Sequence, residues 1–179
     1  MAPVFTIGHS TRTIAEFVEL LRAGEVQLVV DIRSFPRSRT NPQYNVDVLP
    51  GELERFEIAH MRIAELGGLR GGSHRIPAEV NGFWENRSFH NYADYALTDA
   101  FRSGFAQLLE VSAGRRTAIM CAEAVWWRCH RRIVADYLIN AGRSVFHLMG
   151  TNEVIPARLT EAAVAVSGGL NYPAAFDDV

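Results

Sequence analysis

The sequence predicts an α/β fold in three layers, with a mainly parallel five-stranded sheet and helices on both of its faces. Apolar segments rich in β-branched residues alternate along the chain with segments whose apolar residues recur at helical spacing. Strands joined through helices imply right-handed crossovers and hence a parallel sheet. With 179 residues, 48% of them hydrophobic, the chain suits a single α/β domain over residues 1–179.

The first half of the chain is expected to contain three strands. Residues 4–10 (VFTIGHS) form a buried strand, and residues 26–33 (VQLVVDIR) form a second, which ends in charged residues. Between them, residues 13–24 predict an amphipathic helix capped by Gly24. Residues 51–63 (GELERFEIAHMRI) predict a short helix followed by the third strand.

The second half continues the alternation after a glycine-rich loop. We expect, in order, a helix over 92–114, a strand over 115–123, a helix over 129–142, a strand over 144–150 and an outer helix over 158–166. The segments 34–47 and 67–90 are longer than ordinary connections, which favours a binding role for them.

The composition bears on which partners the protein can bind and where in the cell we expect it. The net charge of −2 gives no overall attraction to nucleic acid, and all 18 basic residues are arginine. Arginine binds phosphate and carboxylate through a planar fork, although a complete lack of lysine equally reflects genome base composition. No segment is apolar enough for a membrane span and the N-terminus lacks signal-peptide features, so we expect a cytoplasmic protein without membrane contact.

Polar or chemically capable residues lie at the carboxyl ends of the first four predicted strands. They are His9 and Ser10 for the first strand, Asp31 and Arg33 for the second, Gly67, Gly68 and Arg70 for the third, and Cys121 and Glu123 for the fourth. Ligands of parallel sheets bind beyond the carboxyl ends of the strands. These residues are therefore expected to share one edge of the sheet.

The segment from Cys121 to Arg132 (CAEAVWWRCHRR) concentrates this chemistry and has three interpretations. The N-terminus of the helix that begins near Cys129 favours an anion and a thiolate, which makes either cysteine a candidate nucleophile. The two cysteines could instead bind a metal with His130, but their spacing is not that of a zinc site, so we predict no metal. Alternatively, Cys121 is a plain core residue, and Glu123 and Arg131 form a structural ion pair.

Other candidate residues also keep two interpretations. His9 is either a general acid or base, or it only satisfies backbone groups while Ser10 or Thr11 caps the first helix. Asp31 and Arg33 either pair with each other as scaffold, or Arg33 binds an anion. The loop with Arg33, Arg37, Arg39 and Tyr44 suits a nucleic acid backbone, and the glycines around Gly68 would allow close approach to a phosphate.

The motifs TIGHSTRTIAEFVELL, LVVDIRSFPRSR, LGG, YADYALTDAF and CAE followed by CHRRIVADYL resemble the domain of unknown function 488 family over nearly the whole chain. The matching residues are His9, Ser10, Asp31, Arg33, Pro36, Ser38, Gly67, Gly68, Cys121, Glu123, Cys129, His130 and Arg131. The segment AVWWR departs from the family pattern, and its tryptophans either cap a pocket or pack. The family is defined by its sequence, so the resemblance implies no particular reaction.

Two function classes follow. The first is an enzyme that acts on a phosphorylated or other anionic substrate, such as a nucleotide or nucleic acid, at the carboxyl edge of the sheet. The second is a non-catalytic module that binds a nucleotide or nucleic acid there. For the enzyme, we assign catalysis to His9, Cys121 and Glu123, and substrate binding to Ser10, Asp31, Arg33, Arg37, Gly68, Cys129, His130 and Arg131. The sequence specifies no cofactor and no oligomeric state.

Overall fold

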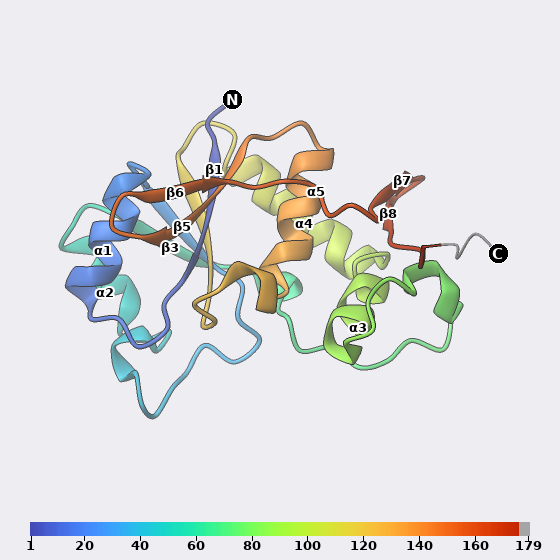
Figure 1. Ribbon diagram of the computed structural model, residues 1–179. Coiled ribbons are helices and arrows are strands. Elements are labelled where there is room, and N and C mark those ends of the chain that lie inside the picture. Colours follow the sequence, from blue (N-terminus) through green and yellow to red (C-terminus); the bar gives the residue numbers. More distant parts are fainter. Residues whose placement is uncertain (176–179) are drawn as a thin grey trace.

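The computed structural model describes residues 1–175 and has a six-stranded sheet with helices on both faces (Figure 1). The strands are β1 (Val4–Gly8), β2 (Leu28–Asp31), β3 (Ala59–Arg62), β4 (Thr117–Cys121), β5 (Val145–Gly150) and β6 (Glu153–Pro156). The α-helices are α1 (Ile14–Ala23), α2 (Leu49–Glu54), α3 (Arg87–Tyr95), α4 (Asp99–Val111) and α5 (Arg131–Asn140). Short 3₁₀ turns are η1 (Pro42–Tyr44), η2 (Ala64–Leu66), η3 (Ala78–Asn81) and η4 (Trp126–Arg128).

The strand order is β3-β2-β4-β1-β5-β6, and the first five strands in this order pair in parallel. The predicted α/β class with a mainly parallel sheet is therefore confirmed. The sixth strand was not predicted. It forms because the chain turns back after β5 through Thr151 and Asn152, and β6 then pairs antiparallel with β5. Asn152 has a φ of 63°, a left-handed conformation that asparagine tolerates in tight turns.

Two predicted helices differ from the structure. The expected outer helix over 158–166 is wrong, since the chain forms instead a small hairpin of β7 (Val164–Val166) and β8 (Gly169–Asn171). Gly168, with a φ of 86°, allows the turn between these strands. The helix expected over 92–114 is divided into α3 and α4, because the Thr98 side chain accepts a hydrogen bond from the N–H of Phe101 and so caps a new helix.

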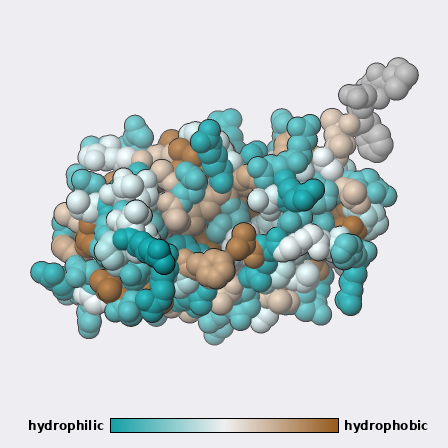
Figure 2. Space-filling view, turned by 90° about the horizontal axis from the view of Figure 1, so that it is seen from below, coloured by the Kyte–Doolittle hydropathy of each residue, from teal (hydrophilic) through white to brown (hydrophobic). Residues whose placement is uncertain are grey.

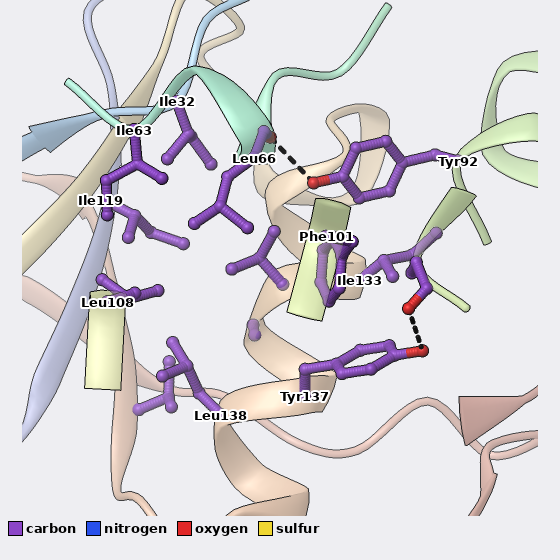
Figure 3. Packing of buried hydrophobic residues seen from close by; sticks show 14 of the residues in the cluster. Ile32, Ile63, Leu66, Tyr92, Phe101, Leu108, Ile119, Ile133, Tyr137 and Leu138 are labelled. Carbon is purple, nitrogen blue, oxygen red and sulfur yellow. Dashed lines mark hydrogen bonds between the residues drawn. The ribbon is translucent and has the colours of Figure 1, made fainter. Parts of the chain in front are cut away.

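Two hydrophobic cores hold the layers together. Helices α1 and α2 cover one face of the sheet, and α3, α4 and α5 cover the other (Figure 1). Figure 3 shows the core between the sheet and helices α4 and α5. Ile32, which follows β2, and Ile119 of β4 belong to this core together with Phe101 of α4 and Ile133 of α5. Within residues 1–175, no helix is long and apolar enough to cross a membrane.

Gly8 lies where the end of β1 meets the segment after β4. A Cβ atom at this position would overlap the carbonyl oxygen of Glu123 and would stand 2.6 Å from Nη1 of Arg131. Both neighbours are fixed within the fold, so they cannot move away at low cost. Glycine is therefore required here for packing and not for an unusual backbone angle.

We expect Gly8→Ala to lower the free energy of unfolding by about 2 kcal/mol or more, because the added methyl group overlaps backbone. Gly51→Ala is the matched control. Gly51 lies in α2, where an added methyl group would meet no atom within 4 Å, so alanine should be neutral or stabilise the helix by up to about 1 kcal/mol. Urea denaturation followed by circular dichroism measures both changes, and equal stabilities of the two variants would contradict the role of Gly8.

Candidate active site at the carboxyl edge of the sheet

The carboxyl ends of β1, β2 and β4 meet at one edge of the sheet, on the lower side of Figure 1. Gly8 pairs with Cys121, and Asp31 pairs with Met120. Beyond the strands, the N–H of His9 donates to the carbonyl of Cys121 over 2.9 Å. The parallel register thus brings the residues that follow three different strands onto one rim.

A buried ion pair joins Asp31 and Arg33 on this rim. Arg33 Nη2 lies 2.6 Å from Asp31 Oδ2, and Arg33 Nε lies 2.9 Å from Asp31 Oδ1. Arg33 Nη2 also donates to the carbonyl of Tyr44 over 2.6 Å. The pair is bidentate and almost fully buried, so it fixes the loop after β2 while part of Arg33 still faces the rim.

The His9 ring is held from several sides on this rim. Its ring stacks on that of Tyr44 with centroids 4.2 Å apart, and its Nδ1 lies 2.8 Å from the carbonyl oxygen of Ser10. Burial lowers the pKa of His9 to about 4, and the nearby Arg33 charge acts in the same direction. Since the carbonyl requires a proton on Nδ1, Nε2 accepts from Arg33 Nη1 at 3.3 Å. Both ring nitrogens are thus engaged, which favours a positioning role over proton transfer.

Arg131, the first residue of α5, is completely buried. Its Nη1 lies 2.9 Å from Cys121 Sγ and 2.6 Å from the carbonyl oxygen of Glu123, and its Nη2 lies 2.9 Å from the carbonyl oxygen of Ala124. No carboxylate of residues 1–175 forms an ion pair with this guanidinium. The group that can balance its buried charge is therefore the thiolate of Cys121.

Cys121 and Cys129 both contact Arg131 and affect each other's pKa. Burial by itself would raise the pKa of Cys121, but a hydrogen bond from the Cys129 thiol and the charge of Arg131 outweigh it and lower the pKa to about 7. Burial and the neighbouring sulfur raise the pKa of Cys129 well above its usual range. Cys121 therefore ionises first, and above about pH 7 the pair holds a thiolate on Cys121 and a thiol on Cys129.

His130 packs tightly against the glycine-rich loop. A Cβ on Gly68 would overlap Nδ1 of His130, so only glycine allows this contact. Nε2 of His130 lies 2.9 Å from the carbonyl oxygen of Ile32, and Nδ1 lies 3.4 Å from Sγ of Cys129. Burial lowers the pKa of His130 to about 4, so the ring is neutral, and with Nε2 protonated against the carbonyl its Nδ1 presents a lone pair toward Cys129 Sγ.

Two hollows adjoin at this edge. The first, here called the thiol hollow, has a volume of about 390 Å³ and contains both cysteines. Its lining residues are Arg33, Ser34, Phe35, Gly68, Leu69, Ser88, Phe89, Cys121, Ala122, Glu123, Arg128, Cys129 and His130. The second, the polar hollow, has a volume of about 430 Å³. Its lining residues are His9, Ser10, Thr11, Arg33, Phe35, Arg37, Ser38, Asn41, Ala122, Glu123 and Ala124.

Phe35 stands between the two hollows and is 74% exposed. Leu69, which also lines the thiol hollow, is 68% exposed. Figure 2 looks at this edge from below and shows apolar surface gathered near the centre of the face, beside hydrophilic side chains. Exposed apolar side chains around a hollow are typical of a ligand site.

The remaining predicted site residues occupy less central places. Glu123 exposes its side chain on the rim, and Arg131 contacts its carbonyl group, so the predicted ion pair between them is not formed. Ser10 and Thr11 line the polar hollow. The expectation that one of them caps α1 is wrong, because Thr13 does so in a capping box with Glu16. Arg37 lies in the same hollow, 3.6 Å from exposed Asp47.

The tryptophans of the segment AVWWR pack differently from each other. The Trp126 ring is parallel to the His147 ring of β5 at 4.5 Å, while Trp127 is 47% exposed. Arg132 lies over the Trp84 ring at 4.8 Å. Trp126 therefore anchors the segment between the cysteines to the sheet.

Sequence reasoning missed the apolar wall of the thiol hollow. Phe35, Leu69 and Phe89 come from two loops and the start of α3, where no periodicity indicates which side chains face inward. The one sequence signal is an apolar residue within an otherwise polar, glycine-rich or proline-rich loop, which holds for Phe35 and Leu69.

The family model described as Domain of unknown function DUF488 matches residues 13–138. The chain belongs to this family. The matched DUF488 segment contains Asp31, Arg33 and the whole stretch from Cys121 to Arg131, whereas His9 and Ser10 precede it. No curated protein and no solved structure matches the chain.

We expect purified protein to contain no stoichiometric transition metal. Among residues 1–175, no group of three or more His, Cys, Asp or Glu side chains is placed to hold a metal ion. The buried Arg131 charge also contacts Cys121 Sγ and would repel a cation there. Elemental analysis checks this, and one zinc per chain that is lost in Cys129→Ser would contradict it.

The alkylation rate of Cys121 by iodoacetamide should rise through a midpoint near pH 7, because only the thiolate reacts. In Cys129→Ala the midpoint should move to higher pH, since the hydrogen bond to the thiolate is lost. Mass spectrometry of the tryptic peptide 117–128 measures the rate. A wild-type midpoint in the ordinary thiol range would show that Arg131 does not activate Cys121.

Proposed function

We propose that this DUF488 protein is an enzyme that uses the Cys121 thiolate as a nucleophile on a phosphorylated or other anionic substrate. The contact that carries the proposal is the 2.9 Å approach of the buried Arg131 guanidinium to Cys121 Sγ, at a sulfur that lines the thiol hollow. A buried cation without a carboxylate partner favours a thiolate at neutral pH. A thiolate at the wall of a hollow is positioned to attack a bound electrophile.

The segment after Cys121 offers donors for the anionic part of the substrate. The N–H groups of Glu123, Ala124 and Val125 donate no hydrogen bond to any described residue. Arg128 lines the thiol hollow, is exposed, and has no ion pair within residues 1–175. Backbone N–H groups and an uncommitted guanidinium are the groups that bind phosphate and carboxylate in proteins.

The shape of the site supports a substrate with both an apolar and an anionic part. Phe35, Leu69 and Phe89 provide apolar surface in the thiol hollow, and Phe35 also borders the polar hollow. A nucleotide meets this description, because its base can stack on an exposed aromatic ring while its phosphate binds beside Arg128. Arg131 then has a positioning role: it is completely buried, and its Nη1 and Nη2 donate to protein atoms. We therefore assign to Arg128 the substrate contact that the sequence suggested for Arg131.

The chemistry that the site supports is group transfer to sulfur. The Cys121 thiolate attacks the phosphoryl or acyl centre, a bond to sulfur forms, and the bond to the leaving group breaks. Arg131 stays beside the sulfur throughout. Water then releases the transferred group and restores the thiolate.

Arg128→Ala should weaken binding of adenosine 5′-monophosphate about tenfold or more, because a charge-assisted hydrogen bond contributes about 1.5–3 kcal/mol. Arg158→Ala, an exposed arginine outside both hollows, is the control and should leave the affinity unchanged. Isothermal titration calorimetry measures both. Equal affinities of wild type and Arg128→Ala would rule out the anion site.

A comparison of wild type with Cys121→Ser distinguishes an enzyme from a binding module. Cys121→Ser should keep nucleotide affinity within about twofold yet lose the release of nitrophenol from aryl phosphates and aryl esters that wild type shows. A wild-type protein that binds nucleotide in an Arg128-dependent way and releases nothing from either substrate class would instead support the non-catalytic module.

A further inference from the structure

The two cysteines of the chain lie at the wall of the thiol hollow. Both are free, and both line the thiol hollow. Arg131 contacts each of them, through Nη1 at 2.9 Å from Cys121 Sγ and through its backbone N–H at 3.5 Å from Cys129 Sγ. Each sulfur also shifts the pKa of the other. Two sulfurs that contact one residue at the wall of one hollow are placed to react with each other after rotation of their side chains.

We propose that Cys121 and Cys129 are a reversible oxidative modification site, at which a hydroperoxide converts the two thiols into an intramolecular disulfide. The site shares its sulfurs with the proposed nucleophile but needs no turnover of any substrate. It therefore stands or falls separately from the proposed function.

The first step is attack of the Cys121 thiolate on one oxygen of the hydroperoxide. A sulfur–oxygen bond forms, the oxygen–oxygen bond breaks, and the departing hydroxide or alkoxide takes up a proton. Sulfur is oxidised by two electrons and the peroxide is reduced, which leaves Cys121 as a sulfenic acid. Arg131 stabilises the thiolate before this step, since it lies beside the sulfur and has no other anionic partner within the described residues.

The second step uses Cys129 as the resolving thiol. Its sulfur attacks the Cys121 sulfur, a disulfide bond forms, the sulfur–oxygen bond breaks, and hydroxide leaves with the Cys129 proton as water. His130 Nδ1, 3.4 Å from Cys129 Sγ, is placed to accept that proton and then to pass it to the departing hydroxide. Loss of the negative charge on Cys121 also makes Cys129 easier to deprotonate, because that charge holds the Cys129 proton in the reduced pair.

Oxidation removes the anion that balances Arg131. In the disulfide form the guanidinium keeps only the carbonyls of Glu123 and Ala124 as partners. A buried charge without a counter-charge destabilises the oxidised form relative to the reduced form. The disulfide is therefore expected to be easily reduced, as regulatory disulfides are.

The test is peptide mapping of the full chain after treatment with a small excess of hydrogen peroxide. Trypsin cleaves after Arg128, so Cys121 lies in peptide 117–128 and Cys129 in peptide 129–131. We expect these two peptides to appear joined without reductant and separate after dithiothreitol. The intact chain should lose the mass of two hydrogen atoms and both of its titratable thiols.

Two variants assign the roles of the sulfurs. Cys129→Ser should stop at a Cys121 sulfenic acid that dimedone traps, and Cys121→Ser should leave Cys129 as a free thiol. Far-UV circular dichroism checks that each variant is folded, while the wild-type mapping is conclusive without them. Chains joined through cysteines of different molecules, or Cys121 oxidised further with no joined peptides, would overturn the proposal. Joined peptides in a protein that neither binds nucleotide nor releases nitrophenol would leave it standing and refute the proposed function alone.

Discussion

The site depends on one buried charge. Arg131 is the first residue of α5, and its guanidinium reaches back beneath the end of β4, where it contacts a sulfur and two backbone carbonyls. Moving a guanidinium out of water is costly unless its donors are satisfied and its charge is balanced. The carbonyls of Glu123 and Ala124 satisfy donors, and the Cys121 thiolate supplies the charge. The turn after β4, the packing of α5 and the reactivity of the sulfur therefore share one cause.

The other groups on the rim also reflect the need to balance buried charge. Asp31 balances Arg33 in a bidentate contact, and neutral His9 fills the remaining space against Tyr44. A histidine held neutral by burial adds no charge beside two arginines. The rim consequently contains two buried cations, each with its own anion, and Arg128 is the cation of the thiol hollow that remains exposed to bind a ligand.

Much of this arrangement could be predicted from the sequence, because it follows from topology. Alternating strands and helices imply a parallel sheet, and a parallel sheet brings Asp31 and Cys121 to one edge whatever their side chains do. The direction in which the Arg131 side chain points could not be predicted from the sequence. It depends on the missing Cβ of Gly8 and on two carbonyls that turn inward, and neither leaves a periodic pattern. The helix expected over 158–166 does not form for a related reason. The hairpin that turns at Gly168 outweighs the helical propensity of the alanines before it.

The stacking of Trp126 on His147 gives the site an optical property. Indole emission responds to the immediate surroundings of the ring, and here the ring stacks on an imidazole whose pKa is lowered to about 4 by burial, so that it is neutral near pH 7. Since Trp126 lies on the segment between the two cysteines, its fluorescence reports on the position of that segment. The chain therefore contains a native spectroscopic probe a few residues from its reactive sulfur, and events there can be followed in real time without a label.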